Sequence, residues 1–275
     1  MTADKPAAPE GLGPKLASFE RKRRVAIVAA IVLVVALVGV GVTWWAATRQ
    51  KPMGQSQTVP AGALEDGGIL VGRDLIPGGE APGSDQVVTV HIVTDFLCPY
   101  CALFEQAHGQ ALAELAQGGA IRLVIQPINW LGGFNGEYSW RALSAVETVA
   151  ALEPEHFWAF YKALWENQPA ESDETSDLTD EAIAALAEQA GVSQATVESF
   201  AEEPAKVWSQ WSSDLGRARI SGTPSVFLSY GSGTPVRWDG WAYEVVDESG
   251  GTGLVAGNLE AALAKVKAGE DPNSE

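Results

Sequence analysis

The sequence predicts an α/β fold that carries a helical insertion and follows a single membrane-spanning helix. An apolar, β-branched run at residues 87–94 precedes a helical stretch, and a second such run follows at 121–128. This order is typical of a βαβ unit. Strand-like runs return only near residue 225, after a long amphipathic region. Residues 25–47 contain no charged side chain, which indicates the membrane span.

The predicted span is long enough to cross a bilayer. At about 1.5 Å per residue, a helix over 25–47 covers the ~30 Å hydrocarbon interior. The alternative is a cleaved signal peptide, but the apolar run is longer than the usual ~7–15 residues. Residues 45–47 also make a poor cleavage site. We therefore expect a retained anchor.

Flanking charge predicts the orientation of this anchor. Four basic residues occupy 21–24, whereas only Arg49 and Lys51 follow shortly after the span. Positive residues stay on the cytoplasmic side, so residues 1–24 are predicted to be cytoplasmic. Trp44 and Trp45 fall at the outer headgroup layer. We expect a single-pass protein of the cell membrane whose remaining chain is extracytoplasmic.

The extracytoplasmic part is strongly acidic. Residues 1–24 hold six basic and three acidic side chains, which leaves 12 basic and 32 acidic ones after them, a net charge near −20. Such a surface argues against nucleic acid or anionic lipid as a ligand. With 46% hydrophobic residues in 275, the chain is long and apolar enough to bury a substantial core.

Residues 48–85 are rich in Gly, Pro, Gln and Ser, and we predict them to be mostly a linker. One apolar island lies at residues 67–72. It is short enough for an edge strand or a hairpin arm, and a covering loop fits equally well.

The folded domain is predicted to span residues 86–268, with a helical insertion at about 136–219 and a tail at 269–275. Its first strand, helix and second strand are expected at 87–94, 98–116 and 121–128. Amphipathic patterns then predict further elements: helices at 138–152, 156–167, 180–190 and 194–201, another helix ending near 219, strands at 225–230 and 236–242, and a helix at 254–268.

The only two cysteines form the motif Cys98-Pro99-Tyr100-Cys101 at a predicted helix N-terminus. The unpaired N–H groups and the dipole there stabilise a thiolate on Cys98. Pro99 fits the first helical turn and stiffens the loop. We predict a redox-active pair in which Cys98 takes the nucleophilic attack and Cys101 resolves the mixed disulfide.

Two other interpretations of the cysteine pair are weaker. Half of a zinc site needs two further ligands, and the chain offers only His91, His108 and His156 as imidazoles, with no second cysteine pair. A structural disulfide that closes so short a loop restrains the unfolded chain very little.

Three segments together resemble the DsbA family of thiol-disulfide oxidoreductases, which have a thioredoxin fold with an inserted helical domain. They are residues 95–101 around the cysteines, the aromatic helix 157–161, and residues 220–227, which read Ile-Ser-Gly-Thr-Pro-Ser-Val-Phe. The resemblance covers 86 to about 268.

The resemblance implies that Pro224 is cis and lies beside Cys98, although a trans turn is the alternative from sequence alone. The Thr223 backbone is then expected to pair with a bound peptide while its side chain tunes the thiolate. Thioredoxin-like proteins often carry a buried acid six residues before the first cysteine, and that position is Ile92 here. Asp95 is interpreted as a strand-end or loop group, and His91 as a structural histidine, so proton transfer is expected to use water.

Tyr100 is a second tuning position, because strongly oxidising relatives commonly carry histidine there; tyrosine leaves the direction of electron flow open. Of the ten tryptophans, Trp158, Trp165 and their neighbours recur at helical spacing and are interpreted as core. Trp130, in the loop 129–134, is a candidate for lining a peptide groove, with packing as the equally weighted alternative.

We therefore expect an extracytoplasmic, membrane-tethered enzyme that oxidises cysteine pairs in exported proteins. The thiols carry the electrons, so no cofactor or metal is expected. Reoxidation is expected from a membrane partner resembling DsbB or a vitamin K epoxide reductase homologue. The alternatives are a disulfide reductase of the same fold, a non-catalytic binding module, and a metal carrier; an isomerase is disfavoured because no separate dimerisation domain is evident.

Overall fold

The computed structural model describes residues 58–132, 138–169, 178–246 and 252–274. The chain divides into two compact units, residues 1–51 and 52–275, and the described residues all belong to the second. The predicted cytoplasmic segment and the predicted span at 25–47 lie outside the described residues. Within those residues, no helix is both long and apolar enough to cross a membrane.

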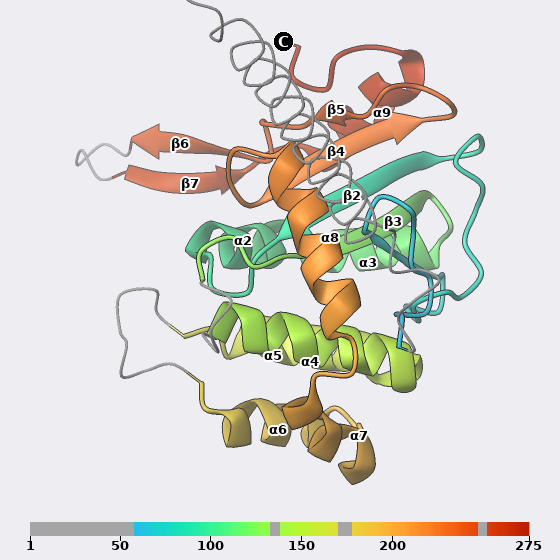
Figure 1. Cartoon of the computed structure of the whole chain (residues 1–275). Helices are drawn as coiled ribbons and strands as arrows, with labels where there is room; N and C mark the ends of the chain where they lie inside the picture. The colour runs from blue at the N-terminus through green and yellow to red at the C-terminus, as the bar shows by residue number, and fades with distance from the viewer. Residues whose placement is uncertain (1–57, 133–137, 170–177, 247–251, 275) are drawn as a thin grey trace, which may run out of the picture. The chain divides into compact units, whose positions relative to one another are not determined.

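A five-stranded mixed sheet forms the centre of the second unit (Figure 1). The strand order is β1-β3-β2-β4-β5, and only the β2–β3 pair is parallel. The strands are β1 (Ile69–Val71), β2 (Val88–Thr94), β3 (Ile121–Pro127), β4 (Ser225–Tyr230) and β5 (Val236–Arg237). The parallel pair is joined by a helix, which confirms the predicted βαβ unit.

Alternation along β2 gives the sheet two buried faces. Val88, Val90 and Ile92 belong to the main apolar cluster, so the residues between them point to the opposite face. That face is covered by α8 (Lys206–Arg219). Gly216 permits the close approach, because a Cβ there would meet Ile128 Cγ2 at 2.7 Å.

The first face is covered by the helix that follows β2 and by the last helix. The helix has three parts: α2 (Pro99–Phe104), the π-helical turn η2 (Glu105–Gly109) and α3 (Gln110–Gln117). The last helix, α9 (Leu259–Ala268), contacts β4 and β2. Figure 1 shows α8 and α3 on opposite sides of the sheet.

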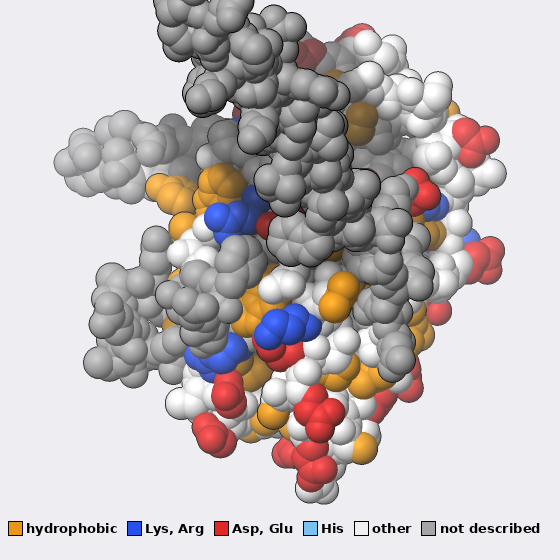
Figure 2. Space-filling model, in the orientation of Figure 1, with side chains coloured by type: hydrophobic (Ala, Val, Ile, Leu, Met, Phe, Trp, Pro, Cys, Tyr) orange, Lys and Arg blue, Asp and Glu red, His pale blue; other side chains and the backbone are white. Residues whose placement is uncertain are grey.

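A helical layer is inserted between β3 and β4, as predicted. It contains α4 (Tyr138–Leu152), η3 (Pro154–His156), α5 (Phe157–Glu166), α6 (Asp180–Gln189), α7 (Gln194–Glu198) and η4 (Ser199–Glu202). Thr179 and Ser193 cap α6 and α7 with their hydroxyl groups. In Figure 2 acidic side chains are prominent over this layer, consistent with the acidic exterior.

Two predicted elements near the C-terminus are wrong. The strand expected at 236–242 is limited to the two residues of β5, and the helix expected from residue 254 begins at Leu259. Between them, β6 (Ala242–Val246) and β7 (Thr252–Ala256) form a separate antiparallel pair. The run at 254–256 was assigned to the helix because it is apolar, and so short a run does not distinguish a strand from a helical turn.

The segment predicted as a linker is partly built into the domain. Its apolar island forms the edge strand β1, antiparallel to β3. Asp66 lies 3.4 Å from His91 Nδ1, while His91 Nε2 and Gln126 Oε1 are 3.0 Å apart. Arg219 at the end of α8 donates to the backbone oxygen of Asp66. The part of this segment around Asp66 and β1 therefore packs against the sheet, and His91 is bonded as expected for a structural histidine.

Glu147 is a fully buried acid in α4. Trp208 Nε1 donates to its Oε1 at 3.2 Å, and its Oε2 has no hydrogen-bond partner among the described residues. Burial raises the pKa of Glu147 from 4.5 to about 8. At neutral pH the folded chain therefore holds a proton on this carboxyl group.

The proton on Glu147 predicts a pH-dependent stability. The unfolded chain releases this proton near pH 4.5 and the folded chain only near pH 8, so the free energy of unfolding falls as the pH rises between these values. Glu147→Gln should remove about 3–5 kcal/mol of that fall. Chemical denaturation from pH 5 to 8 measures it, with Glu155→Gln, an exposed glutamate of η3, as the control. Equal pH slopes in wild type and Glu147→Gln contradict the prediction.

Candidate active site

Cys98 and Cys101 lie where β2 ends and α2 begins, at the carboxyl edge of the parallel strand pair. Cys98 is the N-cap of α2, and Pro99 occupies the first helical turn. Both cysteines are free thiols, 5% and 0% exposed. Tyr100 between them is 56% exposed. The motif therefore presents one sulfur near the surface and keeps the other inside.

The loop before β4 packs against this motif. The Thr223–Pro224 peptide bond is cis, as expected, and Cys98 Sγ donates to the Thr223 backbone oxygen at 3.3 Å. The Thr223 hydroxyl is buried and has no hydrogen-bond partner among the described residues. Residues 125 positions apart in sequence thus meet at the reactive sulfur.

The surroundings of Cys98 favour its thiolate. The neighbouring Cys101 thiol contributes most to lowering the pKa of Cys98 from 9.0 to about 6, and the Thr223 side chain and the backbone N–H groups of Cys101 and Tyr100 add to it. Burial opposes the shift. The Thr223 hydroxyl, unpaired beside the thiol, acquires an acceptor once the sulfur is charged. A pKa near 6 lies between the values of about 7 and about 3.5 typical of thioredoxin and DsbA.

Cys101 has the opposite character. Burial, followed by the hydrogen bond and the charge of Cys98, raises the pKa of Cys101 well above 9.0. Near neutral pH these shifts favour a thiolate on Cys98, which then no longer donates to the Thr223 backbone oxygen, and a proton on Cys101. This is the asymmetry that thiol-disulfide exchange requires: an attacking sulfur and a protonated resolving sulfur.

Asp95 organises the loops around the cysteines. It is 0% exposed, so it is more than the loop group that its sequence position suggested. Its carboxylate accepts hydrogen bonds from Leu97 N, Trp130 N and Leu131 N at 2.6–2.8 Å and from Ser139 Oγ at 2.7 Å. Burial raises its pKa, while these donors oppose the rise. Asp95 thereby joins the loop before Cys98 to the loop after β3 and to α4.

Trp130 lies on this second loop and is partly buried. The Arg217 guanidinium lies 5.9 Å from the centre of its indole ring. Asp95 accepts from the Trp130 backbone N–H, so the loop that carries the indole is tied to the segment before Cys98. Both earlier interpretations, packing and groove lining, are compatible with this position.

Gln168 is a contributor that the sequence did not indicate. Its side-chain nitrogen donates to the backbone oxygens of Phe96 at 2.8 Å and Cys98 at 3.0 Å. It follows α5, about 70 residues after the motif. A polar residue after an aromatic helix carries no signal of such a role.

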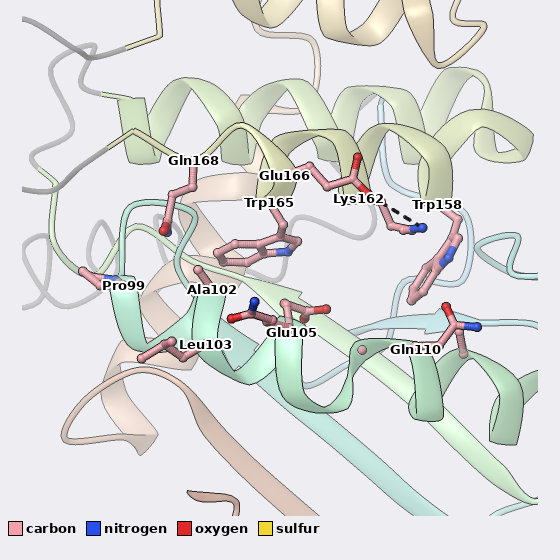
Figure 3. Close-up of a pocket in the computed structure, with 13 residues that line it drawn as sticks. Pro99, Ala102, Leu103, Glu105, Gln110, Trp158, Lys162, Trp165, Glu166 and Gln168 are labelled. Carbon is pink, nitrogen blue, oxygen red and sulfur yellow. Dashed lines mark ion pairs between the residues drawn. The ribbon is translucent and has the colours of Figure 1, made fainter. Parts of the chain in front are cut away.

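A groove of about 590 Å³ runs between α5 and the helix that begins at Pro99 (Figure 3). Leu103, Trp158 and Trp165 give it apolar walls, and Gln168 lies at the end nearest the cysteines. Glu105 also lines it. Among the described residues, no group of three or more His, Cys, Asp or Glu side chains is arranged to hold a metal ion.

Comparison with known proteins agrees with the geometry. A family profile described as Thioredoxin matches residues 83–241, more than half of the chain. The chain belongs to the thioredoxin family. No curated protein sequence matches it.

Solved structures place this thioredoxin-family chain among DsbA-like folds. DsbA from Mycobacterium tuberculosis in its reduced form has 25% identity and a TM-score of 0.51, covering 62% of this chain and 85% of that one. DsbG from the same organism has 25% identity and a TM-score of 0.52, covering 64% and 83%. MdbA, a thiol-disulfide oxidoreductase from Actinomyces oris, has 24% identity and a TM-score of 0.52, covering 62% and 82%.

Removing the Thr223 hydroxyl is expected to shift the pKa of Cys98. Thr223→Val removes a donor to the thiolate and should raise the pKa of Cys98 from about 6. The expected rise is about one pH unit. Thiolate absorbance at 240 nm during a pH titration of the reduced chain measures it, because Cys101 stays protonated over this pH range. Ser221→Ala on the same loop, whose hydroxyl faces Arg237, is the control. An unchanged midpoint in Thr223→Val contradicts the assignment.

Proposed function

We propose that this chain is an extracytoplasmic, membrane-tethered enzyme that oxidises cysteine pairs in exported proteins. The observation that carries the proposal is the N-cap position of Cys98, a pKa of about 6 and its contact with Thr223 of the cis-proline loop. The likeness to DsbA and MdbA structures supports the same chemistry. The membrane tether rests on the uncharged run at residues 25–47.

The reaction consumes the Cys98–Cys101 disulfide. A substrate thiolate attacks Cys98 Sγ, the bond between the two sulfurs breaks, and the electron pair leaves on Cys101 Sγ. The second substrate thiolate then attacks the mixed disulfide, which forms the substrate disulfide and releases Cys98 as a thiolate. The substrate loses two electrons and the enzyme gains them. No metal or organic cofactor takes part in either step.

The direction follows from the stabilised thiolate. At pH 7 a thiol with a pKa near 6 favours the reduced enzyme by about 1.4 kcal/mol over an ordinary thiol, or about 30 mV for two electrons. A stabilised reduced form makes the disulfide a better oxidant. A disulfide also persists outside the reducing cytoplasm, where a membrane partner resembling DsbB or a vitamin K epoxide reductase homologue would restore it.

A redox titration of the full-length chain in detergent tests this direction. The chain is equilibrated with glutathione buffers at pH 7, and alkylation counts the free thiols of Cys98 and Cys101. We expect a potential well above thioredoxin's, toward about −120 mV, of which the Cys98 thiolate accounts for about 30 mV. A potential near about −270 mV indicates a reductase instead. The absence of a reversible disulfide rejects the enzyme and leaves a binding module or metal carrier.

Replacing Cys98 and replacing Cys101 are expected to block the reaction at different steps. Cys98→Ser should abolish peptide oxidation, because the attacked sulfur is gone. Reduced Cys101→Ser should still attack a disulfide through the Cys98 thiolate and accumulate a mixed disulfide, because nothing resolves it. Turnover of a dithiol peptide measures the first effect. Intact-protein mass spectrometry after mixing with oxidised glutathione measures the mixed disulfide. A Cys98→Ser variant with wild-type turnover contradicts the proposed roles.

Trp130 is proposed to bind substrate rather than to tune the cysteines. Trp130→Ala should lower kcat/KM for oxidation of a dithiol peptide by about tenfold, the loss typical of one aromatic contact. The redox potential should stay unchanged, because Trp130 donates nothing to either sulfur. Trp211, which packs against Trp208 in α8, is a matched control. Unchanged peptide kinetics in Trp130→Ala leave only the packing interpretation.

A further inference from the structure

The buried sulfur needs a proton partner. Cys101 must gain a proton when it leaves the disulfide and lose it when the disulfide re-forms, and it is 0% exposed. Ile92 occupies the position where an acid is common in this fold, and it is part of the apolar cluster. His91 is bonded to Gln126 and paired with Asp66. Asp95 already accepts four hydrogen bonds from the loops that it joins.

Glu105 is placed to meet this need. It follows Cys101 by four residues along the helix, so the two side chains share one face. It begins the π-helical turn η2, a distortion that is often found at functional sites. Its carboxylate lines the groove between this helix and α5, and Figure 3 shows it directed into that space. The groove gives the carboxylate a route to solvent that Cys101 lacks.

Tyr161 connects Glu105 to the region of Cys101. Its hydroxyl donates to Glu105 Oε1, and its ring is fully buried. Burial raises the pKa of Tyr161 well above its ordinary value, the charge and hydrogen bond of Glu105 add to the rise, and charge on Cys101 adds a smaller part. The hydroxyl therefore stays protonated and holds the carboxylate in one position.

The other charged groups of the groove leave Glu105 free to titrate near neutral pH. On α5, Lys162 and Glu166 pair with each other at 3.8 Å. On the opposite wall, Gln106 and Gln110 are neutral. Burial raises the pKa of Glu105 from 4.5 to about 7, and the hydrogen bond from Tyr161 limits the rise. A group with a pKa near the working pH is suited to both giving and taking a proton.

We infer that Glu105 is the proton donor and acceptor for Cys101, held in place by Tyr161. This rests on the proposed redox function. When a substrate thiolate attacks Cys98, the electron pair passes to Cys101 Sγ, and the Glu105 carboxylic acid supplies its proton. When a disulfide reoxidises the enzyme, Cys98 first forms a mixed disulfide with it. Cys101 then gives its proton to the Glu105 carboxylate, attacks Cys98 Sγ and expels the partner's thiolate.

A rapid-quench experiment on the full-length chain in detergent separates the two reoxidation steps. The reduced chain is mixed with excess oxidised glutathione from pH 5.5 to 8.5, quenched in acid and weighed by mass spectrometry. The first rate reports glutathionylation of Cys98, and the second reports its replacement by the Cys98–Cys101 disulfide. In the wild type, the second rate should rise with pH through a midpoint near 7, as Glu105 becomes able to accept a proton.

Glu105→Gln should slow the second step at pH 7 by about a hundredfold, the lower end of general base catalysis, and remove that midpoint. The first step should change less than twofold. Glu166→Gln, on the other wall of the groove, should change neither step. Tyr161→Phe removes the donor that lowers the pKa of Glu105, so it should move the midpoint to higher pH. A purely structural role of either residue would not move the midpoint.

The outcomes distinguish this inference from the function on which it rests. A wild type that forms no Cys98–Cys101 disulfide overturns both. A wild type that cycles, together with Glu105→Gln resolving at the wild-type rate at every pH, overturns the inference alone. So does a Tyr161→Phe variant that is folded by its thermal unfolding transition and whose midpoint stays in place.

Discussion

The charge on the Cys98 sulfur is the constraint around which the site is built. A thiolate that is 5% exposed loses most of its hydration, so the protein must replace water with donors of its own. Those donors come from two segments far apart in sequence: the first turn of α2, with its backbone N–H groups and the Cys101 thiol, and the loop at Thr223. The parallel β2–β3 pair and the antiparallel β4 bring these segments to one edge of the sheet. The order of the strands therefore positions the donors that stabilise the Cys98 thiolate.

Holding that charge in one place requires rigid loops, and two side chains supply the rigidity. Asp95 gathers three backbone N–H groups and a hydroxyl, and Gln168 donates to two backbone oxygens beside the motif. The bond from Ser139 to Asp95 and the two bonds from Gln168 join the segment around the cysteines to the inserted helical layer. The insertion therefore does more than enlarge the domain, because it fixes the approach to Cys98 and forms one wall of the groove next to it.

The sequence predicted the parts of the site that are local and missed those that depend on packing. The cysteine motif, its helix and the βαβ unit follow from spacing and pattern. The cis bond before Pro224 was expected through resemblance to a family, since no local rule requires it. Glu105 is the instructive omission: it lies one turn after Cys101, half-buried beside the groove, and no sequence pattern distinguishes it from a solvated helix glutamate. The sequence also missed β7, because its apolar run is too short for periodicity to distinguish a strand from a helical turn.

Glu105 and Glu147 are two glutamates with raised pKa values, one placed to transfer a proton and the other affecting only stability. Burial raises the pKa of both, to about 7 and about 8. Glu147 lies inside the helical layer against Trp208, where a proton exchanges only if the packing opens, so its effect is on stability. Glu105 borders a groove that reaches solvent and shares a helix face with Cys101, so its proton can move while the fold stays closed. Access, more than the pKa itself, separates a buried acid that costs stability from one that can act in each redox cycle.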